Sequence, residues 1–397
     1  MPHISRRIRG LTGDGSGGGD GAGGWGLFYR ARQMKADGLP ILELTIGEHD
    51  IPTAPDILAE MARAAAAGHT GYAAVPGIPA LRLAVAARLA GYGLDYGPDN
   101  ILITPGGQSA LFAAHHAACD EGARALMIDP YYATYPGVIR AVGAVPVAVP
   151  ARSEDGFQPD LAALATAAPG AASLLINSPN NPTGAVYGPK SLAGIARIAQ
   201  AEDLWVISDE VYDSQVWDGA HGPIAALPGM AARTLVVGSL SKSHAMTGSR
   251  LGWVAGPSEV IASMIDLATH TTYGVPGYIQ EAGVYALGLG AEAEARVAAP
   301  FRRRRDRLMA RLAGQNVVRA TPPQGAMYAM LDIRATGLSG AAFAERLLDA
   351  AHVAVMPGES FGQAAAGHLR VALTLPDAAF DEAIGRLLDY ATDLATP

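Results

Sequence analysis

The sequence predicts an α/β protein whose core is a mostly parallel β-sheet. Five short runs of apolar residues lack the polar alternation of a half-exposed strand. They span residues 125–128, 145–149, 173–176, 204–208 and 235–238. Alanine-rich segments with helical spacing lie between these runs, for example at residues 161–167 and 191–201. Strands that are apolar on both faces and alternate with helices indicate a parallel sheet covered by helices on both sides.

A second, smaller domain is predicted from about residue 290. There a long helical segment precedes short strands at 327–333 and 368–373, with a helix at 339–351 between them. This order indicates an α+β unit. A chain of 397 residues is also longer than one ordinary domain. We therefore expect an N-terminal segment with a glycine-rich linker that packs on the small domain (1–48), a large domain (49–289) and a small domain (290–397).

Composition excludes several classes of function. A net charge of -8 disfavours nucleic-acid binding, and the one basic run, 302–305, is predicted to cover a solvated helix face. The single cysteine, Cys119, allows no internal disulfide and suggests a reducing compartment. The pair Arg6-Arg7 is not followed by the apolar run of an export signal, and no apolar stretch is long enough to span a bilayer. We expect a cytoplasmic protein with no membrane partner.

Residues 12–24 form a glycine-rich segment with interspersed aspartates. Such a run can belong to a calcium repeat or a phosphate-binding loop. It occurs once, has no repeat period and does not end in Gly-Lys-Ser/Thr, so a flexible linker is the better interpretation.

The loop around Lys242 carries the strongest chemical signal. Lys242 follows a predicted buried strand and is surrounded by small hydroxyl residues rather than by charges. Such a lysine can lose its proton and form a Schiff base with an aldehyde. Ser239, Ser241 and Arg250 would suit a phosphate dianion nearby. An aldehyde with a phosphate indicates pyridoxal 5'-phosphate, although the segment alone is equally compatible with an ordinary loop lysine.

Asp209 ends another predicted buried strand, where a carboxylate needs a positive partner. A protonated pyridine nitrogen is such a partner. The alternative is a metal site with Glu210, but histidine and cysteine ligands are missing nearby, so we expect no metal. Tyr212 and Asn181 are candidate hydrogen-bond partners of the cofactor's phenolic oxygen, and Asn181 is also a candidate for the substrate carboxylate.

Two further segments fit a cofactor with a phosphate and an aromatic ring. Gly107 and Gln108 begin a predicted helix after a strand, where backbone N–H groups can bind an anion. Tyr132 belongs to an aromatic segment that also follows a strand, so its ring is a candidate for stacking on the pyridine.

Arg370 is a lone charge inside an apolar strand of the small domain. A substrate α-carboxylate would be a suitable bidentate partner. A structural salt bridge is the alternative.

Together these segments resemble the class I/II aminotransferases of fold type I, the aspartate aminotransferase family. The resemblance runs from about Leu44 to the C-terminus. It rests on five motifs that occur in order, at residues 44–48, 72–82, 177–184, 208–212 and 239–252. It implies a large domain with a mostly parallel seven-stranded sheet between helices, a smaller α+β domain, and pyridoxal 5'-phosphate as cofactor.

The resemblance also implies a role for each matching residue. Lys242 would form the Schiff base and then move the proton, while Asp209 and Tyr212 would complete the catalytic set. The implied cofactor-binding residues are Gly107, Gln108, Tyr132, Asn181, Asp209, Tyr212, Ser239, Ser241, Lys242 and Arg250. Tyr72 would reach the phosphate in a neighbouring subunit, which implies a homodimer with shared active sites. Gly47, Asn181 and Arg370 would bind the substrate.

The implied reaction is a ping-pong transfer of an amino group from an L-amino acid to a 2-oxo acid such as pyruvate or 2-oxoglutarate. One subgroup of the family has a lysine at the position of Gln108 that reads an acidic side chain, so a glutamine here favours a non-acidic donor. The segments 231–234, 241–248 and 332–339 look most like the arginine–pyruvate transaminases. The alternatives are a C–S β-lyase or other chemistry on the same cofactor, and more remotely a non-catalytic effector-binding module.

Overall fold

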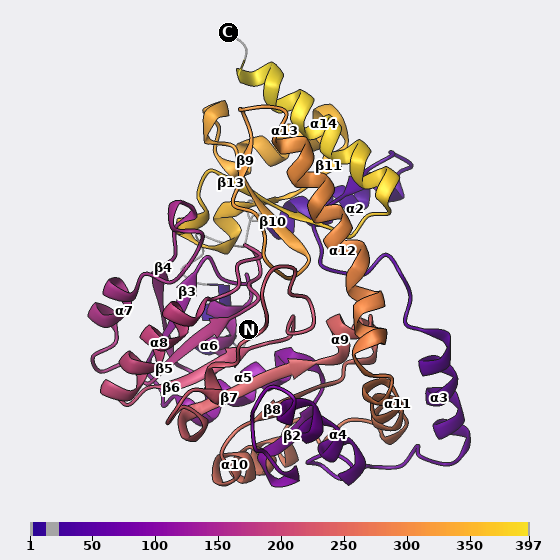
Figure 1. Ribbon diagram of the computed structural model, residues 1–397, viewed down its shortest axis with the longest axis vertical. Helices are drawn as coiled ribbons and strands as arrows, with labels where there is room; N and C mark the ends of the chain where they lie inside the picture. Colours follow the sequence, from indigo (N-terminus) through magenta and orange to yellow (C-terminus); the bar gives the residue numbers. More distant parts are fainter. Residues whose placement is uncertain (1–2, 13–23, 396–397) are drawn as a thin grey trace.

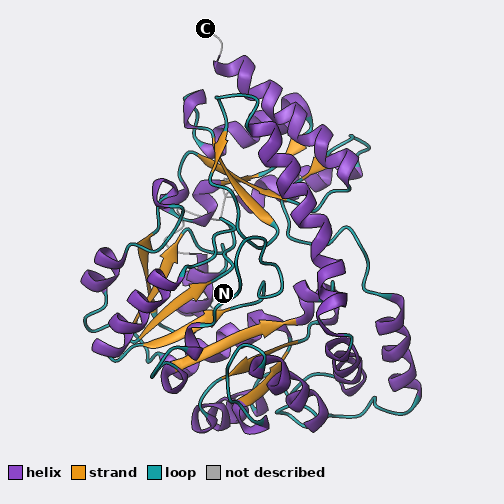
Figure 2. Ribbon diagram, in the orientation of Figure 1, coloured by secondary structure: helices purple, strands orange, loops and turns teal. Residues whose placement is uncertain are grey.

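The computed structural model describes residues 3–12 and 24–395. A seven-stranded sheet forms the centre of the larger part of the molecule, and helices cover both of its faces (Figures 1 and 2). Its strands are β2 (Ile101–Thr104), β3 (Arg124–Asp129), β4 (Val145–Pro150), β5 (Ser173–Asn177), β6 (Trp205–Asp209), β7 (Thr234–Ser239) and β8 (Gly252–Ala255). Their order in the sheet is β2-β8-β7-β6-β5-β3-β4.

All pairs from β4 to β7 are parallel, and β8 runs antiparallel to both β7 and β2. The predicted fold class is therefore confirmed. The surrounding helices are α3 (Pro55–Ala66), α4 (Pro79–Ala90), α5 (Gly106–Ala118), α6 (Tyr135–Ala141), α7 (Leu161–Ala167), α8 (Pro189–Ala201), α9 (Leu240–Ser243), α10 (Ser258–Thr269) and α11 (Gly277–Gly288). The sequence analysis assigned no strand to β8, of which only the first residue, Gly252, belongs to the motif around Lys242.

A second sheet of four strands lies with the C-terminal helices at the other end of the molecule (Figure 1). It consists of β9 (Arg319–Ala320), β10 (Tyr328–Asp332), β12 (Met356–Pro357) and β13 (His368–Ala372), all antiparallel. The helices of this part are α12 (Gly290–Leu312), α13 (Gly340–Ala351) and α14 (Asp377–Ala395). The predicted helices and strands of this region are present, while the exact division into domains stays a prediction.

The N-terminal segment contacts both parts of the molecule. Helix α2 (Gly24–Ala36) packs on α13 and β12, and β1 (Leu42–Glu43) pairs in parallel with β11 (Val353–Ala354). In contrast, α1 (Arg6–Arg9) and the following turn lie against α6, where the Leu11 carbonyl accepts a hydrogen bond from Arg140 Nη1 at 3.4 Å. The expectation that residues 1–48 pack on the small domain is therefore wrong for residues 6–12. The predicted linker at 12–24 lies almost entirely outside the described residues.

The basic run 302–305 does not form a wholly solvated face, as the sequence had suggested. The Arg304 side chain is only 3% exposed and binds Asp50 at 2.6 Å and Asp377 at 2.9 Å. Its Nη1 also donates to the Leu373 carbonyl at 3.0 Å. Arg304 thus ties α12 to the start of α14 and to the loop that contains Asp50. The four residues of the run are all arginines, so the sequence alone could not show which of them is buried.

Across the described ranges, no helix is long and apolar enough to cross a membrane.

Replacing Arg304 by alanine is predicted to lower the free energy of unfolding by about 3–5 kcal/mol, because two carboxylates lose their buried partner. Arg303→Ala is the matched control: Arg303 binds the same Asp377 at 2.6 Å, but its side chain is 51% exposed. We expect a loss below about 1 kcal/mol for this control. Urea denaturation of both variants measures the difference, and equal losses would show that burial of Arg304 does not matter.

Candidate active site

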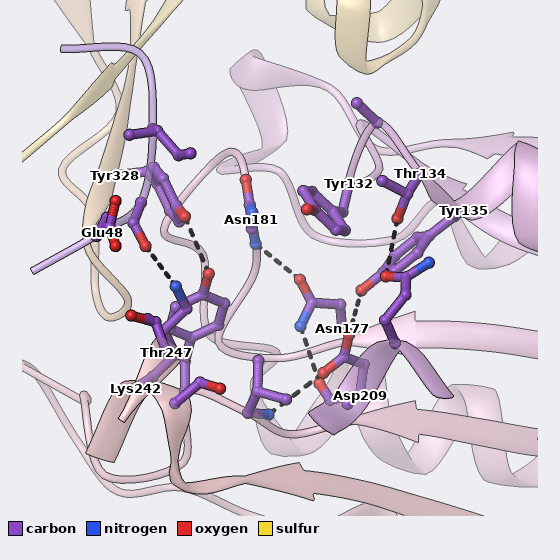
Figure 3. A pocket seen from close by; sticks show the side chains of 18 of the residues that line it. Glu48, Tyr132, Thr134, Tyr135, Asn177, Asn181, Asp209, Lys242, Thr247 and Tyr328 are labelled. Carbon is purple, nitrogen blue, oxygen red and sulfur yellow. Dashed lines mark hydrogen bonds between the residues drawn. The ribbon is translucent and has the colours of Figure 1, made fainter. Parts of the chain in front are cut away.

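A cavity of about 560 Å³ lies between the carboxyl ends of the central strands and the second sheet. Parallel strands present their carboxyl ends at one edge, so the residues that follow β5, β6 and β7 meet there. Figure 3 shows Lys242, Asp209 and Asn181 converging on this space, with Tyr328 of the second sheet beside them. Every predicted site residue except Tyr72 lines it, namely Gly47, Gly107, Gln108, Tyr132, Asn181, Asp209, Tyr212, Ser239, Ser241, Lys242, Arg250 and Arg370.

Lys242 lies on the one-turn helix α9, directly after β7. Its Nζ donates to the Gly47 carbonyl, so the amine already points across the cavity. Its own carbonyl accepts two hydrogen bonds, from Gln215 Nε2 at 3.1 Å and from His49 Nε2 at 3.0 Å. Because a carbonyl can only accept, His49 carries its proton on Nε2. These two donors fix the main chain beneath the reactive side chain.

His49 remains a neutral donor over the physiological range. Burial lowers its pKa to about 4, and the nearby Lys242 charge acts in the same direction. The sequence analysis assigned no role to His49 or to Gln215.

Asp209 is a buried carboxylate with no cationic partner among the described residues. It is 5% exposed, and it accepts hydrogen bonds from Tyr135 Oη at 2.6 Å and from the Val211 N–H at 3.3 Å. Burial raises its pKa to about 6 despite these two bonds. Tyr135 is held with its proton, because burial and the adjacent Asp209 raise its pKa. A buried carboxylate that is bonded only to neutral donors, as Asp209 is, is suited to bind a cationic group of a ligand.

Residues around the start of α5 form a cradle for an anion. Gly107 and Gln108 lie in the first turn, where backbone N–H groups have no intrahelical acceptor. Ser239 Oγ lies 2.9 Å from Ser241 Oγ and caps α9 by accepting from the Ser241 N–H at 3.1 Å. The hydroxyls and the N–H groups therefore face one small region of the cavity.

Arg250 closes this cradle in a strained backbone conformation, with φ at +51°. Its guanidinium donates only to carbonyls, those of Thr247 at 3.1 Å and Pro105 at 3.5 Å. The described residues place no carboxylate within salt-bridge distance of it. Gly106 beside it has a φ of +76°, a backbone conformation that glycine adopts without strain. A cation held without an acid, next to free N–H groups, is suited to a dianion.

Arg370 is buried in the second sheet and projects into the opposite side of the cavity. It is 5% exposed, and its guanidinium carbon lies 4.6 Å from the centroid of the Tyr328 ring and 4.4 Å from that of Phe361. It donates to the Thr45 carbonyl and to Asn181 Oδ1, the latter at 3.0 Å, while its Nε has no acceptor. Burial lowers its pKa. The structural salt bridge considered for Arg370 is absent among the described residues, which leaves it free for a ligand carboxylate.

The floor of the cavity is fixed by polar contacts that sequence reasoning missed. Asn177 accepts from the Asn181 N–H at 2.7 Å and donates to the Asp209 carbonyl at 2.9 Å, which joins the two segments (Figure 3). Tyr328 Oη lies 3.0 Å from Tyr212 Oη. A Cβ at Gly47 would come within 1.7 Å of that same Tyr328 oxygen, so only glycine fits there.

The geometry agrees with a comparison to known families. A family model described as aminotransferase class I and II matches residues 40–387. The chain belongs to this family. The predicted resemblance is confirmed, and the protein is an aminotransferase.

Individual aminotransferases are similar over almost their whole length. The chain is 41% identical to an arginine–pyruvate transaminase of Pseudomonas aeruginosa, over 95% of this chain and 96% of that protein. It is 36% identical to the aspartate/prephenate aminotransferase of Thermus thermophilus, over 90% and 92% of the two chains. A solved double mutant of Thermus thermophilus aspartate aminotransferase superimposes with a TM-score of 0.90 at 33% identity, covering 99% and 100%. These names do not favour the β-lyase or effector-binding alternatives.

Tyr72 is the one predicted site residue outside the aminotransferase cavity. Its side chain is 91% exposed, and its ring lies 5.1 Å from the edge-on ring of Tyr273, which is itself 52% exposed. Within one chain, Tyr72 therefore takes no part in the site.

Because Asp209 is buried, its ionisation is predicted to lower the free energy of unfolding of the ligand-free aminotransferase by an amount that depends on pH. The folded-state pKa is raised from 3.8 to about 6. Asp209 is therefore protonated in both folded and unfolded chains below pH 4, whereas at neutral pH the folded chain must hold it ionised. Asp209→Asn should increase the free energy of unfolding by about 3 kcal/mol at pH 7.5, and the gain should vanish toward pH 4.

Chemical denaturation of the ligand-free wild type and variant at both pH values measures this gain. Asp99→Asn is the control, because the Asp99 side chain is 92% exposed. A variant gain that is the same at both pH values would contradict the argument.

Proposed function

We propose that this aminotransferase binds pyridoxal 5'-phosphate in the described cavity. The observation that carries the proposal is the separation of unpaired charges around Lys242: a buried acid at one end, Asp209, and a cation with free N–H groups at another. Asp209 would face a pyridinium nitrogen, and the cradle of Gly107, Gln108, Ser239, Ser241 and Arg250 would hold a phosphate. Tyr132 lines the cavity near Asp209 and would cover the ring face.

When bound, the cofactor supplies an aldehyde that takes up the donor's amino group and a ring that withdraws electrons from the reacting carbon. Asp209 would hold the proton on the ring nitrogen, and Tyr135 would hold Asp209 in place. Tyr212 and Asn181 would orient the ring through its phenolic oxygen, with Tyr328 orienting Tyr212.

Lys242 would act twice. Its Nζ, which points across the cavity, would be the group that holds the cofactor's aldehyde carbon. The freed Nζ would take the proton from the donor's α-carbon and return it to the former aldehyde carbon. One water would be taken up as the 2-oxo acid leaves, and a second 2-oxo acid would then receive the amino group. His49 and Gln215 would keep the lysine main chain still during both transfers.

Arg370 would bind the substrate α-carboxylate together with Asn181, with Gly47 contributing through its backbone. Arg370 Nε is buried without a hydrogen-bond acceptor, and the guanidinium face is stacked away from solvent. A substrate carboxylate would supply the acceptor that Nε lacks. Carboxylate binding in the second sheet would also draw that part toward Lys242 and exclude water.

The amino donor would be a non-acidic L-amino acid such as arginine. The acceptor would be a 2-oxo acid such as pyruvate or 2-oxoglutarate. Among the described lining residues, the cations are Lys242, Arg250 and Arg370, each with a role above. None is left for a second carboxylate, since Gln108 is neutral and Glu48 is acidic. This shortage favours pyruvate over 2-oxoglutarate.

The working enzyme would be a cytoplasmic homodimer. Tyr72 and Tyr273 form an exposed aromatic pair, and Tyr273 has a φ of +57°. Burial of this pair against a second copy would bring Tyr72 to the partner's phosphate and make the two sites interdependent.

The cofactor proposal predicts that wild-type protein loaded with pyridoxal phosphate absorbs as a lysine adduct and converts to the amine form when donors are added. Titration with a panel of L-amino acids ranks the donors. Lys242→Ala should still bind the cofactor but form no lysine adduct and give no turnover. If the wild type shows no absorbance of the lysine adduct, the cofactor proposal is wrong. If the adduct is present but no donor converts it to the amine form, lyase chemistry is favoured.

The role of Arg370 predicts that Arg370→Lys raises KM for the donor on the order of 10-fold to 100-fold, because lysine cannot reproduce the bidentate contact. Steady-state kinetics with alanine as donor and 2-oxobutanoate as acceptor, followed by the release of pyruvate, measure it. Arg334→Lys is the control, since Arg334 lies in the same part of the chain with a side chain 51% exposed. An unchanged KM in Arg370→Lys would remove Arg370 from substrate binding.

A further inference from the structure

A second cavity lies behind one wall of the active site. Its volume is about 510 Å³, close to that of the first cavity. The two cavities share Trp25, Gln108, Ala133 and Thr134, so this wall is a single layer of residues. No step of the proposed reaction uses the second cavity.

The lining of the second cavity is apolar with a few neutral polar groups. Leu11, Leu102, Phe112, Val138 and Leu267 supply most of the apolar surface. Threonine and serine hydroxyls and the Gln108 amide supply the polar part, and no charged side chain is among the described lining residues. Such a surface fits an uncharged, largely aliphatic group.

The wall can be opened at low cost. Its polar contact is the hydrogen bond from Thr134 Oγ1 to Gln108 Oε1, which at 3.3 Å is long for a bond between two oxygens. Trp25, the remaining large side chain of the wall, is 43% exposed, and its ring packs edge-on against Phe28 with the centroids 5.7 Å apart. A ligand could separate Thr134 from Gln108 without breaking a strong contact.

The bound donor would point its side chain at this wall. Its α-carboxylate would occupy Arg370, its nitrogen would lie at Lys242, and the space over Asp209 would be filled by the ring. Figure 3 shows Thr134 on the far side of the cavity from Tyr328, the residue that packs on Arg370. The side chain of the donor would therefore extend toward Thr134 and Gln108.

We propose that the second cavity is a subsite for the outer part of a long, uncharged donor side chain, with Thr134 and Gln108 as its gate. This inference rests on the proposed function and narrows its substrate class. Among the described lining residues, a guanidinium pushed through the gate would find no carboxylate, whereas Glu48 lines the first cavity. Aliphatic donors of increasing length gain contacts that a short donor cannot make.

The first test measures binding without turnover. Straight-chain carboxylates from butanoate to octanoate are titrated into the holoenzyme by calorimetry, since they can occupy Arg370 but carry no amino group. We expect the Kd to fall about fourfold per added methylene once the tail passes the gate. A Kd that stops falling at pentanoate would overturn the proposal.

The second test fills or enlarges the cavity away from the reaction. Ala141 is the last residue of α6 and lines only the second cavity, and Phe112 lies across from it on α5. Ala141→Phe should lower the ratio of kcat/KM for 2-aminooctanoate to that for alanine at least 10-fold. Phe112→Ala should raise the same ratio. Ala201→Phe is the matched control, because Ala201 is the last residue of α8 on the same sheet and is exposed.

The outcomes separate this inference from the proposed function. Activity with alanine but no response of the ratio in either cavity variant would refute the subsite and leave the aminotransferase site intact. If alanine and every other donor fail to convert the bound cofactor, the proposed function itself fails. If Ala141→Phe does not fold, the carboxylate series and Phe112→Ala still decide.

Discussion

The active site depends on holding opposite charges buried in one cavity without letting them pair with each other. Asp209 ends a strand of the large sheet, and Arg370 lies within a strand of the second sheet. Each is almost fully buried, and each is satisfied only by neutral groups: Tyr135 and a backbone N–H for the acid, Asn181, a carbonyl and two aromatic faces for the base. Buried charges held this way cost stability in the empty protein and are ready for ligand charges.

The rest of the architecture keeps these groups apart and aligned. The parallel strands bring Asp209 and Lys242 to one edge, while the loop containing Gly47 crosses from the second sheet and meets the lysine amine. Arg88 of α4 binds Asp213, in the turn after β6, at 2.8 Å and also contacts Glu294 at the start of α12. This buried link joins the turn after β6 to the long helix that carries the second sheet.

In the proposed enzyme, substrate specificity would arise at the wall of the site rather than at its centre. The groups that would bind the cofactor and the α-carboxylate are supplied by strand ends and leave little room for variation. Gln108, Thr134 and Trp25 form this wall, and all three come from a loop or from the first turn of a helix, where length and sequence can change without disturbing the sheet. The proposed subsite behind this wall would let such changes select donors by length and charge.

Much of this protein could be predicted from the sequence alone because the decisive signals are local. Apolar runs fixed where the parallel strands lie, and the chemistry of Lys242 and Asp209 follows from their position directly after those strands. Tertiary structure decided which distant groups complete the site. Arg370 finds the Thr45 carbonyl 325 residues away, His49 finds Lys242 across 193 residues, and Tyr212 meets Tyr328 across 116. Hydrophobic periodicity specifies which face of an element is buried, but not which partner it meets, because that partner depends on how the two sheets and the N-terminal segment cross in space.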